Sequence, residues 1–443
     1  MKTFTSIQEI QKILEGAINI RDKVVTVVDA KAIKSDVWAD MAYTSTFGSS
    51  EVKDLARRVI FAVGESLGIK RQSIHNLYMA IGRGETGGFS MPAINLRAIT
   101  FHSALSAFKA AKKLNVGAVI MEIARSEIGY TDQPPMEYAA NVVAAAIAAG
   151  WNRPVFLQGD HFQANRKKYL ADPDSEVAAI KNLVARALEA GFYNIDVDSS
   201  TLVDISKKNL RDQQELNSKV CADITRFIRE KSPKGVIVSV GGEIGEIGGT
   251  NSNEADMDAF MDGFLEYAGD IESISKMAVQ TGTAHGGVVL PDGSIASVKL
   301  DFDVLKRLGR MAREKYHIGG VVQHGASTLP EDMFYRFPQE KTLEVHLATQ
   351  FQNMVYDHIP ADLKNEIYTW LESEKKAEWK DGWTREQFLY KTRKRAIGAF
   401  KKQLWDMPEP IIEEIMQALE MKFTHLFKLL GMENSVDKIT PYL

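Results

Sequence analysis

From residue 90 onward, short runs rich in valine and isoleucine alternate with polar loops and with longer segments of helical periodicity. Residues 176–190 show the helical pattern, because apolar positions recur three and four residues apart and the segment ends at Gly191, a typical C-terminal signal. The runs of β character number eight, and they are residues 90–96, 117–124, 154–160, 194–198, 235–243, 276–282, 319–324 and 343–349.

Eight β runs separated by helices predict an α/β fold, a parallel (β/α)₈ TIM barrel. Strands of such a barrel are buried on both faces, so they should be continuously apolar rather than alternating, and several of these runs are. A doubly wound open sheet is the alternative. It is disfavoured because no Gly-x-Gly-x-x-Gly motif opens a helix after the first run.

The two ends of the chain lie outside this rhythm. We expect a mostly helical N-terminal extension at 1–84 with a β-like run at 24–28, a catalytic barrel at 85–352, and a C-terminal helical region packed on the barrel at 353–443. A basic run at 390–395 is either a solvated helix face or a contact to a phosphate group or another subunit. Both interpretations stay open.

Composition narrows the class of partner. The chain of 443 residues has a net charge of -4 and a pI near 6.2, which argues against a nucleic-acid or anionic-membrane surface. No apolar run reaches the roughly 18 residues that span a bilayer, and the N-terminus lacks the apolar stretch of a signal peptide. We therefore expect a cytoplasmic protein. Its one cysteine, Cys221, cannot form an intrachain disulfide and should be a small buried side chain.

Three histidines each follow a β run and have a glycine or aspartate beside them: His161, His285 and His324. Strand ends on one side of a barrel surround a common mouth, so these imidazoles can converge although they are far apart in sequence. Three neutral imidazoles around a divalent ion leave a coordination position open, as a catalytic metal requires. Carboxylates occupy equivalent strand ends at Asp160, Asp198 and Glu243.

A single histidine beside glycine is more often a hydrogen-bonding loop residue than a ligand. Three at matching strand ends, with three carboxylates, favour a metal site. The other histidines without this placement are expected to be structural: His75, His102, His317, His358 and His425. Gly286, Gly325 and Ser327 lie beside the predicted ligands and suit either a phosphate, which backbone N–H groups can approach closely, or a tight turn.

In this order along eight strands, the motifs resemble class II, metal-dependent fructose- and tagatose-bisphosphate aldolases over roughly residues 85–350. The resemblance is carried by residues 89–95, 160–161, 197–202, 243–249, 282–286 and 324–327. It implies that His161, His285 and His324 hold zinc, with Co²⁺ or Mn²⁺ as other candidates. It further implies that Asp160 exchanges protons with the aldehyde oxygen, and that Asp198 and Glu243 support the ligands or replace them.

The resemblance also implies a substrate site. Gly286, Gly325 and Ser327 would hold the phosphate of a ketose, and Asn95 of the first strand would contact the substrate. In the eighth strand the family has asparagine before x-x-Thr, where this chain has His346 before Thr349. The first carboxylate of the loop in which the family carries a glutamate base is Glu254, and a serine of the family's second strand is replaced by Ala124.

The implied activity is cleavage or formation of the C3–C4 bond of a ketose (bis)phosphate such as fructose 1,6-bisphosphate, through a zinc-stabilised enediolate. A ketose or ketose-phosphate 4-epimerase working by retro-aldol cleavage and re-addition is the alternative. A catalytically silent subunit is disfavoured by the retained histidines. The resemblance suggests a homodimer or larger oligomer, in which Arg385, Arg393 or Arg395 completes a neighbour's phosphate site.

Overall fold

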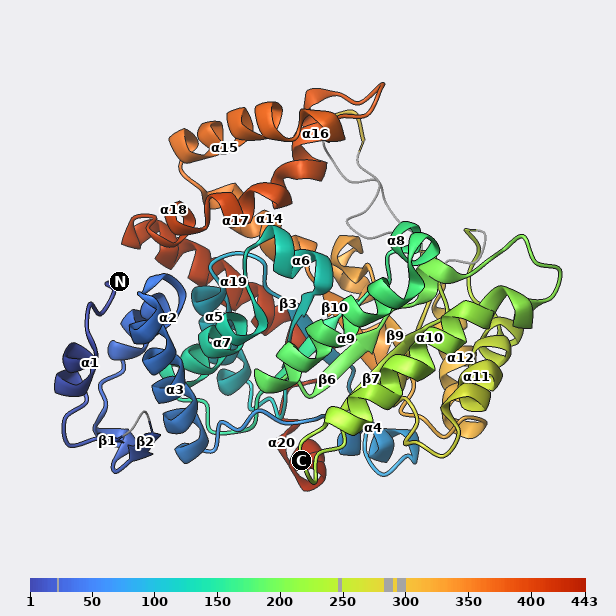
Figure 1. The fold of residues 1–443 in the computed structure, drawn as a ribbon, viewed down its shortest axis with the longest axis horizontal. Coiled ribbons are helices and arrows are strands. Elements are labelled where there is room, and N and C mark those ends of the chain that lie inside the picture. Colours follow the sequence, from blue (N-terminus) through green and yellow to red (C-terminus); the bar gives the residue numbers. More distant parts are fainter. Residues whose placement is uncertain (22–23, 246–248, 283–289, 293–299) are drawn as a thin grey trace.

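The eight predicted β runs form a closed barrel of parallel strands in the order β10-β3-β4-β5-β6-β7-β8-β9 (Figure 1). The computed structural model describes residues 1–443 apart from 22–23, 246–248, 283–289 and 293–299. The closed parallel barrel confirms the predicted (β/α)₈ fold. Its strands are β3 (Met91–Asn95), β4 (Ile120–Ala124), β5 (Phe156–Asp160), β6 (Asn194–Val197), β7 (Ser239–Glu243), β8 (Lys276–Val279), β9 (Val321–Gln323) and β10 (Glu344–Leu347).

Every residue of these strands is buried, which explains why the runs are continuously apolar apart from a few polar positions. Helices that follow the strands pack side by side around the barrel and cover its outer surface. They are α5 (Thr100–Lys113), α7 (Pro135–Ala148), α9 (Pro173–Glu189), α10 (Leu210–Lys231), α11 (Glu254–Ala268), α12 (Phe302–Glu314) and α14 (Thr349–His358), with short helices α6 (Arg125–Tyr130), α8 (Arg166–Ala171) and α13 (Arg336–Gln339) in the loops.

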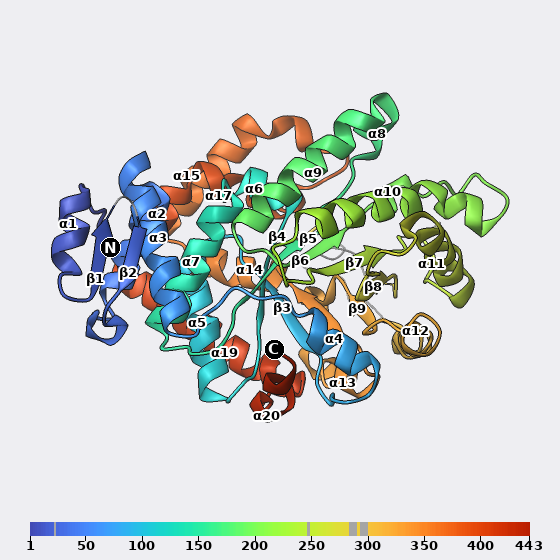
Figure 2. The same cartoon turned by 60° about the horizontal axis from the view of Figure 1, so that its bottom comes forward.

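The N-terminal segment packs on the outside of the barrel (Figure 2). Helix α1 (Ile7–Ile13) precedes an antiparallel hairpin of β1 (Ile18–Arg21) and β2 (Val24–Val27). Helices α2 (Val37–Phe47) and α3 (Ser50–Ser66) lie against α7. Helix α4 (His75–Gly82) sits at the opposite end of the barrel from the strand carboxyl ends, where the Tyr78 hydroxyl donates to the buried carboxylate of Glu344.

The C-terminal helices return across the barrel. Helix α19 (Glu409–Leu429) packs against α5 and α14, while α15 (Ala361–Glu374) and α16 (Arg385–Thr392) lie above the end at which the strands terminate (Figure 1). A 3₁₀ turn, η6 (Arg393–Arg395), follows α16 directly. The remaining helices are α17 (Ala396–Ala399), α18 (Lys401–Trp405) and α20 (Val436–Ile439).

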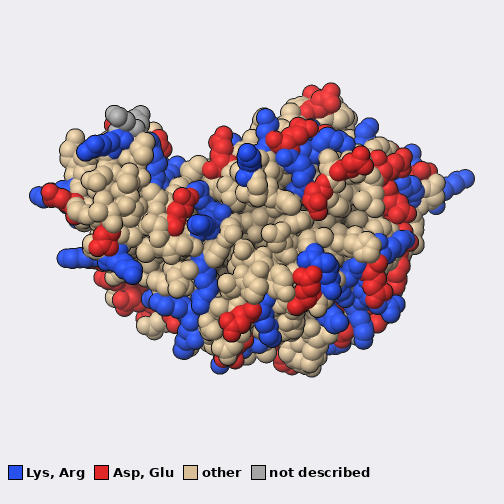
Figure 3. Space-filling model, turned by 90° about the horizontal axis from the view of Figure 1, so that it is seen from below, with Lys and Arg blue, Asp and Glu red and all other residues tan. Residues whose placement is uncertain are grey.

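The surface seen in Figure 3 carries acidic and basic side chains intermixed around a centre of uncharged residues. Within the described residues, no helix is both long enough and apolar enough to cross a membrane. The single cysteine, Cys221, is fully buried in α10, and burial raises the pKa of its thiol to about 12. The thiol is therefore protonated at neutral pH and acts as an apolar packing group.

Candidate active site

The turn after β5 fixes the first predicted ligand. Gly159 has no room for a side chain, because a Cβ there would lie 2.5 Å from the ring of Phe162. His161 takes a left-handed conformation with φ of 42°, which turns the chain so that Phe162 folds back into the core. The Phe162 N–H then donates to the Asp196 carbonyl at 2.8 Å, and this bond ties the turn to the neighbouring strand β6.

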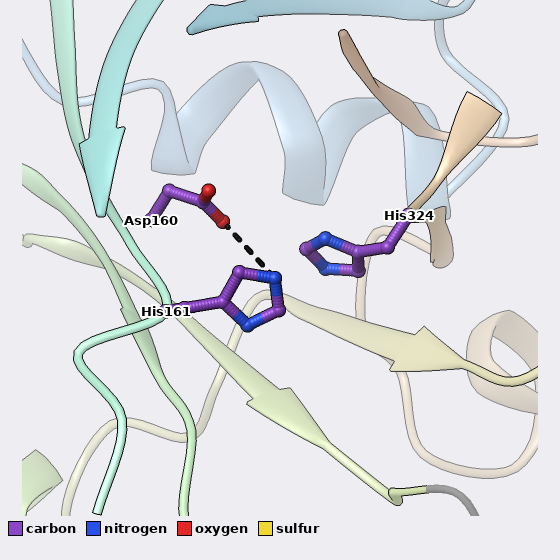
Figure 4. Close-up of side chains that lie close together, drawn as sticks. All are labelled: Asp160, His161 and His324. Atoms are coloured by element: carbon purple, nitrogen blue, oxygen red, sulfur yellow. Dashed lines mark ion pairs between the residues drawn. The ribbon is translucent and has the colours of Figure 1, made fainter. Parts of the chain in front are cut away.

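The result is a compact cluster of histidines and carboxylates at the strand ends, of which Figure 4 shows Asp160, His161 and His324. His161 Nδ1 lies 3.0 Å from Asp198 Oδ2 and 2.7 Å from Glu243 Oε1, and His161 Nε2 lies 3.6 Å from Asp160 Oδ1. The rings of His161 and His324 have centroids 4.3 Å apart. His324 Nε2 is 3.9 Å from Glu243 Oε1, so residues of β5, β6, β7 and the β9 loop meet at one point.

Burial and like charge shape the protonation of this cluster. Burial, together with the nearby Asp198 carboxylate, raises the pKa of Glu243 to about 7. Burial also opposes a charged His161, but the carboxylates of Asp160 and Glu243 outweigh it and raise its pKa well above the usual range. Asp198 is held ionised despite burial, because hydrogen bonds from His161 and Ser200 lower its pKa. The cluster therefore places three carboxylates, those of Asp160, Asp198 and Glu243, around the imidazole of His161, and this excess of negative charge favours a bound cation.

These residues fit a divalent metal ion. Donor atoms of Asp160, His161 and His324 lie within 4.8 Å of one another, and nitrogen with carboxylate oxygen is the donor set that zinc and similar ions accept. If His161 bound through Nε2, its Nδ1–H would donate to Asp198, which is the support that metal-bound histidines usually have. His285 lies outside the described residues.

His346, on β10, joins this cluster to the barrel interior. Its Nδ1 lies 3.1 Å from Glu122 Oε2 and 3.3 Å from Asp160 Oδ1, and its Nε2 lies 2.6 Å from Glu344 Oε1. Burial disfavours the imidazolium, but Glu122 and Glu344 raise the pKa of His346 well above its ordinary value. His346 is therefore cationic, and it fixes the orientation of the Asp160 carboxylate by a charge-assisted contact.

Beneath His346 lies a fully buried polar floor centred on Lys276 of β8. Its ammonium group lies 2.8 Å from Asp196 Oδ1 and 2.6 Å from Glu344 Oε1, and it donates to Gln158 Oε1 at 2.8 Å. A Cβ on Gly241 would come within 2.3 Å of Asp196 Oδ1, so glycine at this position leaves space for the ion pair. Three residues of the floor each precede a residue of the cluster by two positions: Gln158 precedes Asp160, Asp196 precedes Asp198, and Glu344 precedes His346. Side chains two apart in a strand point to the same face, so the floor lies directly beneath the cluster.

A cavity of about 570 Å³ opens above the cluster. Asp160, His161 and His324 line part of the cavity, and cationic and aromatic side chains form another part of its wall. These wall residues come from the loop after β3, from α6, from α16 and from η6, and they are Arg97, Tyr130, Tyr390, Lys391 and Lys394. The volume suits a small organic molecule, and the lining combines the cluster of histidines and carboxylates with cationic side chains.

The sequence model described as fructose-bisphosphate aldolase class-II matches residues 76–435, which contain the barrel, the cluster and most of the C-terminal helices. The chain belongs to this family. A comparison with curated protein sequences gives no match.

A comparison with solved structures gives matches that are distant in sequence. The chain is similar to the glycerol-bound fructuronate-tagaturonate epimerase UxaE from Cohnella laeviribosi, at 12% identity, with a TM-score of 0.57 and coverage of 94% of this chain and 90% of that one. A probable tagatose 6 phosphate kinase from Sinorhizobium meliloti gives 16% identity, a TM-score of 0.52 and coverage of 80% and 100%. The YdjI aldolase of Escherichia coli K12 gives 14% identity, a TM-score of 0.49 and coverage of 82% and 98%.

In this chain, several of the residues predicted to bind substrate lie at the cavity. Gly325, with a left-handed φ of 69°, lines it together with Ser327, His346 and Thr349. The Ser327 hydroxyl accepts from the Ala348 N–H at 2.7 Å, so the β9 loop is fastened to the end of β10. Gly286 lies outside the described residues.

Two other predicted residues are placed differently. Asn95 is buried beside the cavity, where its amide donates to Glu127 Oε2 at 2.6 Å and lies 3.5 Å from Asp160 Oδ2. Glu254 begins α11, is half-exposed and forms an ion pair with Arg307. It is not among the described residues that line the cavity.

Sequence reasoning did not single out the polar floor or the specific wall residues. Glu122, Asp196 and Lys276 are charged residues inside otherwise apolar strand runs, and this mismatch is the signal that would have found them. Lys391 and Lys394 belong to the basic run at 390–395, for which the sequence allows either a solvated helix face or a contact to a phosphate group or another subunit. The three candidate arginines make other contacts in this chain: Arg385 with Glu372, Arg393 with Asn353, and Arg395 with Glu378.

Proposed function

We propose that this protein is a metal-dependent aldolase that cleaves and forms the C3–C4 bond of a ketose phosphate. The observation that carries the proposal is the convergence of Asp160, His161 and His324 at the strand ends of a chain in the class II aldolase family. Zinc is the ion we propose, held by His161, His324 and His285. When bound, it would stabilise the negative charge that bond cleavage leaves beside the carbonyl.

Asp160 is the proposed proton carrier. In the cleavage direction Asp160 removes the proton of the C4 hydroxyl and the C3–C4 bond breaks. The electron pair of this bond passes toward the C2 carbonyl, which gives an enediolate and an aldehyde. A carboxylate in reach of both products can return the proton in the reverse direction. His346 is a positioning residue here, because its imidazolium faces Asp160 Oδ1 at 3.3 Å and favours the ionised, proton-accepting carboxylate.

Asp198 and Glu243 lie within 3.0 Å of His161 Nδ1 and support this ring. They are also the proposed alternative ligands, because their carboxylate oxygens and a nitrogen of His161 lie within 4.8 Å of one another. Gly325, Ser327 and Thr349 form the proposed phosphate-binding edge next to the histidines. Gly325, which has a left-handed backbone, carries no side chain that would keep a phosphate oxygen away from its N–H.

A ketose 4-epimerase is the second candidate. Here the aldehyde formed by cleavage rotates and adds back, so that one carbinol centre inverts without product release. Two observations favour it: the similarity in fold to a fructuronate-tagaturonate epimerase, and the position of Glu254, which is paired with Arg307 away from the cavity rather than near the substrate.

The deciding experiment incubates metal-loaded protein with fructose 1,6-bisphosphate, tagatose 1,6-bisphosphate, fructose and tagatose. Triose release is followed with a coupled dehydrogenase, and ketose stereochemistry by NMR. We expect triose release from at least one phosphorylated ketose. An isomeric ketose without free triose would support the epimerase instead. Absence of both products with zinc, cobalt and manganese would contradict both candidates.

Metal binding is tested separately from turnover. We expect His161→Ala to lose stoichiometric metal by elemental analysis while keeping the far-UV circular dichroism of the parent. The matched control is His425→Ala, which removes an exposed histidine of α19 whose partner is Glu331. Full zinc content in the His161 variant would refute the proposed ligand set.

A further inference from the structure

The cationic wall of the cavity is built by this chain's own C-terminal segment. Lys391 lies on α16 and Lys394 on the following turn η6, and both line the cavity that contains Asp160 and His324. The segment is held in place at both ends of α16. The Thr384 hydroxyl donates to the Pro291 carbonyl at 2.7 Å, and the Tyr356 hydroxyl of α14 donates to the Arg393 carbonyl at 2.6 Å.

Lys394 has an unusual environment for a lysine. Its side chain is largely withdrawn from solvent, and within the described residues its ammonium group forms no hydrogen bond or ion pair. It lies 5.8 Å from the centroid of the Tyr130 ring. Burial, with repulsion from Arg97 and Arg395, lowers its pKa to about 8, against a weaker opposing effect of Glu127. An ammonium in this setting gains more from an anionic partner than a solvated one does.

Arg97 lines the same cavity as this lysine and the reacting groups. Its side chain is 12% exposed, its Nε donates to Glu127 Oε1 at 2.7 Å, and its Nη1 donates to Gln352 Oε1 at 3.0 Å. Its Nη2 makes no hydrogen bond with the part of the chain that the structure describes, so this donor is available to a ligand. The pKa of Arg97 is raised, although burial opposes the charge, by carboxylates that include Glu127 and Asp160.

The local charge count favours an anion. Glu127 is the carboxylate that faces this group, and it already accepts from Arg97, from the Asn95 amide and from the Ala124 N–H. Glu127 is therefore the one described carboxylate that is hydrogen-bonded to Arg97, and it also accepts from other donors, whereas Asp160 acts on Arg97 only through its charge. A bound oxyanion would replace the missing charge and receive charge-assisted hydrogen bonds from a rigid guanidinium and a mobile ammonium.

We propose that Arg97 and Lys394 form a subsite for a terminal oxyanion of the substrate, a phosphate or a carboxylate at the end of the ketose remote from the metal. The proposal rests on the proposed function for the orientation of the ketose. It assigns the C-terminal segment a role in substrate selection within its own chain. Lys391, on the same wall, adds to the positive potential of the subsite.

The experiment compares three ketoses that differ at C6: fructose, fructose 6-phosphate and a ketohexuronate. Binding to the metal-loaded protein is measured by calorimetry, and turnover by the assays described above. We expect one or both anionic ketoses to bind at least about tenfold more tightly than fructose, as one charge-assisted hydrogen bond allows. The arm with the larger advantage identifies the oxyanion.

Variants locate the effect. Lys394→Met should reduce the preference for the anionic ketose to less than about twofold without changing the affinity for fructose, and Lys394→Arg should restore it. The matched control is Lys376→Met, which removes an exposed lysine of the same C-terminal segment. An undiminished preference in Lys394→Met, or equal binding of all three ketoses by the parent, would overturn the subsite.

The design separates this proposal from the proposed function. Anion preference that depends on Lys394, without triose release or epimerisation, would support the subsite and reject the proposed reaction. Turnover of a phosphorylated ketose with unchanged kinetics in Lys394→Met would support the reaction and reject the subsite.

Discussion

The floor and the wall of the cavity hold their lysines in opposite ways. On the floor, Lys276 is fully buried between Asp196 and Glu344, and these carboxylates raise its pKa despite the burial. On the wall, Lys394 has neighbouring cations and a lowered pKa. A buried charge that is paired with protein carboxylates stabilises the fold. A buried charge without such a carboxylate can instead pair with an anionic ligand. The same residue type therefore marks architecture in one place and recognition in the other.

The largest effect that we expect concerns the strand-end cluster above the floor. Asp160→Asn keeps the shape of the side chain but removes the proton acceptor, so kcat should fall by about 10²–10⁴-fold with metal content unchanged. Steady-state kinetics and elemental analysis test this, with Asp174→Asn, an exposed aspartate of α9, as control. A kcat within tenfold of the parent would remove Asp160 from the proposed chemistry.

The floor lysine should matter next, through stability. Lys276→Met removes the buried ammonium group that contacts both Asp196 and Glu344, which should lower the free energy of unfolding by about 3–5 kcal/mol although His346 still contacts Glu344. Urea unfolding measures the change. Adding Glu344→Gln to the variant should recover part of the loss. By contrast, Lys394→Met should leave the unfolding free energy unchanged or raise it, and a comparable loss in both lysine variants would erase the distinction between floor and wall.

The wall lysine should show itself in the pH dependence of binding. Lys394 is cationic below its pKa of about 8 and neutral above it, so affinity for an anionic ketose should fall about tenfold between pH 7 and pH 9. The charged groups facing it, Arg97, Arg395, Lys391 and Glu127, do not reverse this sign. Lys394→Arg should flatten the profile because the guanidinium stays charged. Calorimetry with fructose as neutral reference tests this, and a flat parent profile would contradict it.

The smallest effect belongs to a carboxylate outside both regions. Glu254 is paired with Arg307, whose hydrogen bond lowers the pKa of the glutamate, and it does not face the cavity. In this arrangement Glu254→Gln should change kcat by less than about threefold, since it removes an exposed ion pair of small energy. A loss of a hundredfold would show instead that the loop brings Glu254 to the substrate during the reaction.

The sequence predicted the barrel well because each strand is buried on both faces and stands out as an apolar run. It also predicted that strand-end residues meet, since the topology alone brings His161, Asp198 and His324 to one mouth. Predicted residues Asn95, Gly325 and Thr349 likewise lie at or beside the cavity. The confirmed barrel and the positions of these residues both depend on periodicity and connectivity, which are local properties of the chain, and the roles of the residues stay predictions.

The wall could not be assigned in this way. Lys391 and Lys394 lie on helical turns after the barrel, and their approach to Arg97 depends on how the C-terminal helices pack, which no periodicity encodes. The floor was missed for another reason. Glu122, Asp196 and Lys276 face inward in strands that are otherwise apolar. Such charges are tolerated because Lys276 pairs with Asp196, and Glu122 contacts His346 and accepts from Gln158.

The left-handed backbone of His161 carries a consequence for evolution. An L-residue in this conformation costs roughly 1–2 kcal/mol relative to glycine, so the backbone conformation alone would favour glycine at this position. The backbone geometry and the site therefore favour different residues at position 161, where the imidazole also pairs with Asp198 and Glu243. Among relatives of this chain, glycine there would mark descendants that have given up the activity, and histidine those that still bear its cost.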